Sequence, residues 1–260
     1  MEIIDSHCHI YPGKIAEKAV AAIGDFYGID MELKGTVDDL QENLKKSGVS
    51  KAVVHSTATK PEQVPSINNF IVDVISNNQN LIGFGTMHPD YELIEEEYIK
   101  IISSGLKGIK LHPDFQKINI DDKSMYPIYE IICDSIPILF HIGDETKDYS
   151  NPLRLKKILD DFPKLKVIAA HLGGYRKWEE SMEILQCDNV WVDTCSSFSF
   201  LSDDMILKLI NHYGTDKVLF ATDYPMWNFK GEYERITSLG LENSVLERIF
   251  SKNIKELIKI

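Results

Sequence analysis

Short runs of apolar and β-branched residues recur along the chain, each bounded by turn or polar residues. Such runs are typical of buried strands. The segments between them place apolar residues on one helical face, as amphipathic helices do. Strands are predicted at residues 2–6, 51–56, 81–86, 107–112, 136–141, 166–171, 189–194 and 217–222.

Two of the amphipathic segments carry clear start and stop signals. Asn151 can cap a helix over 152–162 that Pro163 ends, and Ser202 can cap another over 203–213. The apolar stripe in each segment predicts that one face packs against a sheet. Six further helices are predicted near 37–47, 62–77, 91–104, 124–134, 175–186 and 242–258.

The alternation of strand and helix implies a parallel sheet with its helices outside. The length of 260 residues is close to the roughly 250 that are typical of a closed barrel of eight strand–helix units. No linker, repeat or low-complexity segment interrupts the pattern. We therefore predict an α/β fold, a (β/α)8 TIM barrel forming a single domain over 1–260. The stretch 11–36 is longer than a simple loop and is expected to place a helix or lid over the barrel mouth.

Four predicted strands end in side chains that can bind a metal. His7 and His9 lie two residues apart, so both imidazoles point to the same face of a strand. His141, His171 and Asp223 end three later apolar runs. Because the functional sites of such barrels lie at the carboxyl ends of the strands, these side chains are expected to converge there.

His7, His9, His141 and Asp223 make up a donor set that suits one Zn²⁺, with iron, manganese or nickel as alternatives. Such an ion lowers the pKa of a bound water toward about 7. Asp223 would hold or accept the proton of that water, and His171 is predicted to act as an acid or base beside the ion.

The composition limits the classes of binding partner and the compartment expected for the protein. The net charge of −12 disfavours binding to nucleic acid phosphates or anionic membranes. The sequence has no basic segment followed by an apolar stretch at its start, so we do not expect a signal peptide. No apolar run approaches the length of a membrane span. The four cysteines lack paired spacing and are expected to be reduced. We expect a cytoplasmic enzyme that acts on a small molecule, with homo-oligomer formation left open.

The sequence resembles the amidohydrolase superfamily, and within it the amidohydrolase-related (amidohydrolase 2) group of metal-dependent hydrolases and decarboxylases. Five motifs, in the family's order and at barrel spacing, carry this resemblance over essentially the whole chain. What it implies is that His7, His9, His141 and Asp223 bind the catalytic metal and that His171 assists the chemistry. The motifs are Asp5-Ser6-His7-Cys8-His9, Gly108-Ile109-Lys110-Leu111-His112-Pro113, Pro137-Ile138-Leu139-Phe140-His141-Ile142-Gly143, Ala170-His171-Leu172-Gly173-Gly174 and Ala221-Thr222-Asp223-Tyr224-Pro225.

Lys110 and His112 share a face of the fourth predicted strand. In many two-metal relatives a lysine on this strand is carboxylated and bridges two ions, so the resemblance leaves a two-metal site open beside the preferred one-metal site. Otherwise Lys110 pairs with an interior carboxylate and His112 orients the substrate or satisfies a loop. His55 and His88 end the second and third strands, and a structural role and a substrate contact are equally open for them.

The leading interpretation is a metal-dependent hydrolase of a small amide, ester or lactone that uses a metal-activated water. The alternative is a metal-dependent decarboxylase of a small aromatic or unsaturated acid, because the same group contains both. A deoxyribonuclease of the TatD type shares the His-x-His start, but the acidic balance and the sparse basic loops disfavour it.

Overall fold

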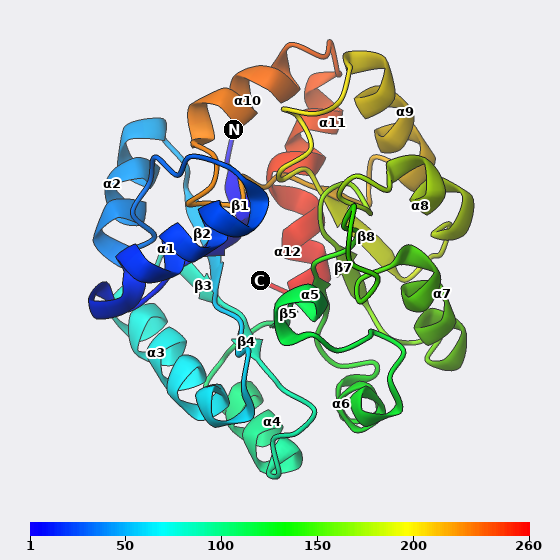
Figure 1. Ribbon diagram of the computed structural model, residues 1–260. Helices are drawn as coiled ribbons and strands as arrows, with labels where there is room; N and C mark the ends of the chain where they lie inside the picture. Colours follow the sequence, from blue (N-terminus) through cyan, green and yellow to red (C-terminus); the bar gives the residue numbers. More distant parts are fainter.

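The computed structural model describes residues 1–260, with strands around a central ring and helices outside it (Figure 1). Every pairing between neighbouring strands is parallel. All eight predicted strands are confirmed, the third being divided into β3 and β4. The strands are β1 (Ile4–His9), β2 (Lys51–His55), β3 (Leu81–Gly83), β4 (Gly85–Thr86), β5 (Ile109–Leu111), β6 (Ile138–Phe140), β7 (Val167–Ala169), β8 (Val190–Asp193) and β9 (Val218–Leu219).

Two seams divide the ring into one sheet of β1 to β3 and another of β4 to β9. At the first seam the chain passes between the sheets at Phe84, whose amide still donates to a carbonyl of β2 at 3.0 Å. At the second, the Ser6 amide donates to the Phe220 carbonyl at 2.9 Å, and Cys8 forms a parallel bridge with Tyr224. Backbone hydrogen bonds therefore cross both seams, and the architecture is the predicted (β/α)8 barrel.

Capping residues start the helices where the sequence predicts them. Asn151 caps α7 (Pro152–Asp161) and Ser202 caps α9 (Asp203–Tyr213), each side chain accepting a hydrogen bond from a first-turn amide. Helices α5 and α10 were not predicted from the residue pattern. The other helices are α1 (Gly13–Tyr27), α2 (Val37–Ser47), α3 (Val64–Asn77), α4 (Ile94–Ser103), α5 (Pro113–Gln116), α6 (Tyr126–Ile132), α8 (Trp178–Ile184), α10 (Phe229–Thr237), α11 (Asn243–Glu247) and α12 (Asn253–Ile258), with short turns η1 (Pro61–Gln63), η2 (Lys123–Met125) and η3 (Arg248–Lys252).

Apolar side chains form two cores, one between the strands and the outer helices and one inside the ring. In the inner core, Ile4, Leu139 and Leu219 pack together with Leu257 of α12. The Asn253 side chain also donates to the carbonyl of Val218 at 2.8 Å. Helix α12 therefore closes the end of the barrel at which the strands begin. A functional site can lie at the opposite end, where the strands terminate. None of the helices combines the length and the apolar character that crossing a bilayer requires.

Glu232 is a buried carboxyl group on α10, and its Oε2 atom has no hydrogen-bond partner. Burial raises its pKa well above the usual 4.5, and Asp5 and Asp223 add to this shift. The folded state therefore holds the proton more tightly than the unfolded chain, and ionisation destabilises the fold as pH rises above the unfolded value.

We accordingly expect Glu232→Gln to raise the melting temperature by about 2–4 °C at pH 8, and by less at pH 5. Thermal denaturation followed by circular dichroism measures the difference, and Glu234→Gln on the exposed face of the same helix is the control. An equal gain at both pH values would contradict the assignment.

Candidate metal centre

Three donor atoms from β1 and from the segment after β9 form a compact triangle. Strand β1 continues past its predicted end at residue 6, so His7 and His9 both lie within it and face the barrel interior. Their Nε2 atoms are 3.1 Å apart. The Oδ1 atom of Asp223 lies 3.4 Å from His7 Nε2 and 3.3 Å from His9 Nε2. Ligands about 2.0–2.2 Å from a single ion have separations of this size, so the triangle, named here the His7–His9–Asp223 triangle, fits a metal.

The protonation states of the triangle suit the same role. Burial lowers the pKa of His7 and of His9, so both imidazoles are neutral at neutral pH. Burial alone would raise the pKa of Asp223, but His7, His9 and His171 outweigh it and hold that pKa well below its usual range. Neutral imidazoles and an ionised carboxylate are the forms in which these side chains bind metals.

Asp193, the last residue of β8, supports the triangle from behind. Its Oδ2 atom lies 2.8 Å from His7 Nδ1, and its Oδ1 atom accepts a hydrogen bond from the His171 amide at 2.9 Å. A carboxylate on the second nitrogen of a histidine is typical of metal ligands, because it orients the ring. Asp193 was not among the site residues predicted from sequence, although it lies at the end of a predicted strand as Asp223 does.

His171 lies beside the triangle. Its Nδ1 atom is 4.0 Å from Asp223 Oδ2. Burial lowers the pKa of His171 to about 4, so at neutral pH the ring is neutral and can accept a proton. His171 and Asp223 have φ angles of 63° and 61°, in the left-handed region that side-chain-bearing residues rarely adopt. Such backbone strain clusters at functional sites.

The structure does not place His141 in the triangle. Its Nδ1 atom lies 2.8 Å from His171 Nε2, and its Nε2 atom lies 2.9 Å from the carbonyl oxygen of Gly143. Both ring nitrogens therefore have partners other than the triangle. His141 as a fourth ligand stays a prediction from sequence.

Lys110 and His112 face the interior from β5 and its end. Lys110 is completely buried, and its Nζ atom lies 3.2 Å from His7 Nε2. Burial lowers the pKa of this amine. His112 stacks on His141 with ring centroids 4.0 Å apart, and its Nε2 atom lies 3.1 Å from the hydroxyl of Tyr27. Lys110 thus joins the triangle, whereas His112 belongs to the wall of the site.

Helix α1 and the segment after it cover the mouth of the barrel, which confirms the helix predicted within 11–36. Tyr27 at its end was not anticipated as a site residue. A small cavity, with a volume of about 20 Å³, lies beneath. Its lining combines apolar and aromatic side chains from α1, α5 and the segments after α1 and β9 with polar side chains at the strand ends: His7, His9, Ile23, Tyr27, Met31, Lys110, His112, Phe115, His141, His171, Asp223, Pro225 and Met226.

Several proteins with similar sequences or folds are decarboxylases. The chain is 26% identical over 204 residues to 2-amino-3-carboxymuconate-6-semialdehyde decarboxylase of Dictyostelium discoideum, a match that covers 61% of this chain and 55% of that protein. The chain thus spans about half the length of this curated relative.

Two solved structures share the fold over nearly the whole length of both chains. A 2,6-dihydroxybenzoate decarboxylase in complex with 2,6-dihydroxybenzoate has a TM-score of 0.79 and 16% identity, with both chains covered completely. A dihydroxybenzoic acid decarboxylase from Polaromonas sp. JS666, with bound manganese and the inhibitor 2-nitroresorcinol, has a TM-score of 0.76 and 14% identity. This match covers 99% of the present chain and 97% of that enzyme.

These relatives overturn the hydrolase expected from the sequence. The named reactions among them are decarboxylations, which agree with the alternative interpretation instead. The error has a chemical reason, because imidazole and carboxylate donors at the ends of barrel strands bind a metal for either reaction. The family model described as Amidohydrolase matches residues 4–260, and the chain therefore belongs to the amidohydrolase family of enzymes.

Proposed function

We propose that this protein is a metal-dependent decarboxylase of a small aromatic or unsaturated acid. The main support for the proposal is the set of side chains that line one cavity. It brings the His7–His9–Asp223 triangle, the amine of Lys110 and the neutral ring of His171 against apolar and aromatic walls. The chemistry of this lining suits a planar organic anion, because apolar and aromatic side chains match its apolar part and the polar side chains match its charge. The substrates named for the relatives, a carboxymuconate semialdehyde and a dihydroxybenzoate, support this class.

We infer that the triangle holds one divalent ion. Two neutral nitrogens and one carboxylate suit manganese, iron or zinc, and the Polaromonas relative binds manganese. When bound, such an ion supplies positive charge that stabilises the negative charge left on the substrate as carbon dioxide departs.

Two side chains of this protein would carry out the remaining steps. Lys110, when protonated, attracts the substrate anion toward the triangle. His171 takes up a proton as that negative charge enters, and Asp223 at 4.0 Å stabilises the resulting imidazolium. The bond to the carboxyl carbon breaks, its electron pair stays on the substrate carbon, and the proton of His171 forms the new C–H bond. Water then returns one proton to His171 for each carbon dioxide released.

A test of the reaction class uses a panel of hydroxybenzoates and unsaturated carboxylic acids with the Mn²⁺-loaded protein in deuterated, oxygen-labelled water. We expect one carbon dioxide for each product molecule, one solvent deuterium on the carbon that lost its carboxyl group, and no labelled oxygen in the product. The double variant His7→Ala, His9→Ala serves as the background control. Labelled oxygen in the product without release of carbon dioxide would contradict the proposal.

A further inference from the structure

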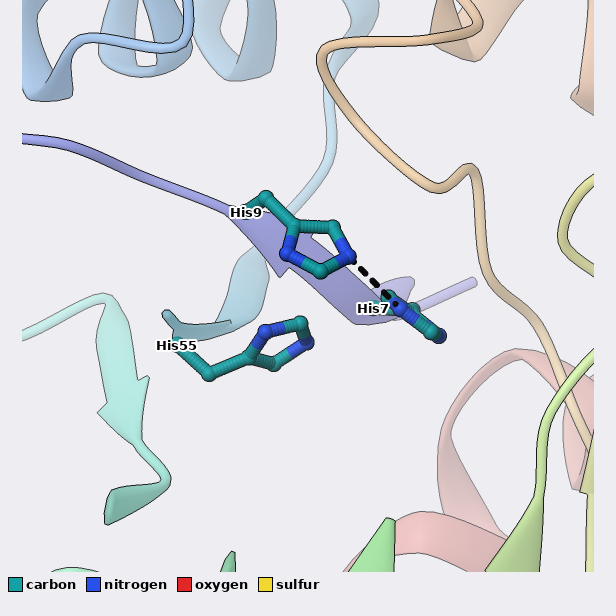
Figure 2. A group of neighbouring side chains, drawn as sticks. All are labelled: His7, His9 and His55. Atoms are coloured by element: carbon teal, nitrogen blue, oxygen red, sulfur yellow. Dashed lines mark hydrogen bonds between the residues drawn. The ribbon is translucent and has the colours of Figure 1, made fainter. Parts of the chain in front are cut away.

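Backbone pairing holds the strand side of the cavity in place. His7 and His9 extend from β1, and the ring of His55, from β2, lies beside them (Figure 2). The two strands pair in parallel, with His9 aligned to His55. The cavity measures about 20 Å³. Sites for small molecules usually measure about 300–1,000 Å³. A substrate therefore gains room only if the opposite side of the cavity moves.

Helix α1 and the segment after it form that opposite side, to which they contribute Ile23, Tyr27 and Met31. The chain enters and leaves this cover beside Tyr11, whose amide donates to the carbonyl of Gly35 at 2.8 Å. Tyr27 is the one residue of α1 whose side chain forms a hydrogen bond with the barrel. Helix α1 can therefore move as a cover, and Tyr27 is its polar contact with the site.

The partner of Tyr27 determines the direction in which its hydroxyl can donate. Tyr27 Oη lies 3.1 Å from Nε2 of His112. The other ring nitrogen of His112, Nδ1, accepts a hydrogen bond from the Phe115 amide at 3.4 Å, where α5 begins. A ring nitrogen that accepts a hydrogen bond carries no proton, so the ring proton of His112 lies on Nε2. His112 therefore donates to the Tyr27 oxygen.

The hydroxyl proton of Tyr27 is left without an acceptor, because His112 is the only hydrogen-bond partner of that hydroxyl in the protein. Burial raises the pKa of Tyr27 well above its usual 10, and Asp223 adds to this shift, so the phenol keeps its proton. A desolvated donor that has no acceptor costs free energy until a ligand supplies one. The hydroxyl borders the cavity, where that ligand would lie.

We propose that Tyr27 is a substrate-binding residue, and that its hydroxyl donates a hydrogen bond to an oxygen of the substrate anion when α1 covers the cavity. The inference rests on the proposed function and concerns how the substrate is held. Because His112 donates to the Tyr27 oxygen, the hydroxyl becomes a stronger donor. The triangle and Lys110 attract the anion from the strand side. The preferred acids thus carry an oxygen that faces α1.

The first test compares Tyr27→Phe with the parent, both loaded with Mn²⁺, on the panel of hydroxybenzoates and unsaturated carboxylic acids. Titration calorimetry measures affinity, and carbon dioxide release gives KM and kcat. We expect the affinity to fall and KM to rise by about tenfold or more, while kcat changes by less than about threefold. The bound Mn²⁺ should not change. Tyr233→Phe, the same substitution on the exposed face of α10, is the control and should match the parent.

The second test locates the ring proton of His112 in the parent protein, so it depends neither on turnover nor on the folding of a variant. Nuclear magnetic resonance of protein labelled with ¹⁵N-histidine distinguishes protonated from bare ring nitrogens. We expect the proton on Nε2 and a bare Nδ1. A proton on Nδ1 would make Tyr27 the donor to His112 and would overturn the inference.

The outcomes separate this inference from the proposed function. Parent affinity and parent KM in folded Tyr27→Phe would overturn the inference and leave the proposed function intact, and so would a fall in kcat alone. Weaker binding by the variant, without carbon dioxide release from any acid, would support Tyr27 as a binding residue and contradict the reaction class. A parent protein that binds no acid of the panel would overturn both.

Discussion

Replacing His7 and His9 together by alanine is expected to produce a folded protein that has lost its metal and its activity. The double variant removes two of the three donors in the triangle, and Asp223 alone cannot hold an ion against dialysis. We expect the metal affinity to fall by at least about a hundredfold, since even residues that only support a ligand contribute about tenfold or more each. Elemental analysis after dialysis, together with carbon dioxide release from an active substrate, measures the loss.

The control for this experiment is His212→Ala, because His212 lies on α9 among the outer helices. Its metal content and activity should match those of the parent. Full metal occupancy in the double variant, with native circular dichroism, would show that the triangle is not the metal site.

Replacing His171 by asparagine is expected to leave the metal bound and to lower kcat by about a hundredfold or more, the usual contribution of a positioned acid or base. His171 lies outside the triangle, with its Nδ1 atom 4.0 Å from Asp223 Oδ2, so its loss should affect proton transfer before metal binding. Steady-state rates of carbon dioxide release and elemental analysis of the same preparation separate the two effects.

A different result in the same variant would support the two-metal alternative. If the parent carries two ions and His171→Asn loses one of them, then His171 is a ligand and Lys110 is the candidate bridge. Mass spectrometry of the intact parent protein would then show the added mass of a carboxylated lysine. A parent protein with one ion, retained in the variant, agrees with the single-metal site proposed here.

The reaction class could not be predicted from the residue pattern. Histidines and an aspartate at strand ends predict a metal, and a histidine beside them predicts proton transfer, but hydrolases and decarboxylases need both. The two reactions differ in the substrate group that reacts. In hydrolysis a carbonyl is attacked by water, whereas in decarboxylation a carboxylate leaves a carbon that can accept a proton. That choice depends on the shape and the charge of the cavity, to which α1 contributes Ile23 and Tyr27 and the segment after it contributes Met31.

The barrel itself could be predicted because strand and helix signals are local. Apolar runs, capping residues and prolines act within one or two turns of the chain, which is why α7, α9 and the eight strands lie where they were expected. The missed elements are also instructive. Helix α10 was not predicted because few of its residues are apolar. The predicted strand ended before the polar residues His7 and His9, whereas β1 includes both.

The sequence by itself determined the order of the elements and which strand ends carry metal-binding side chains, since both depend on residue type and local periodicity. Only the tertiary structure decided which of those side chains meet. His7 and Asp193 are 186 positions apart, and the parallel register of β1 and β2 aligns His55 with His9. The hydrogen bonds that turn His141 toward His171 likewise join different strand ends. Ring orientation and access to hydrogen-bond partners arise from packing between distant segments, and no local pattern in the chain encodes them.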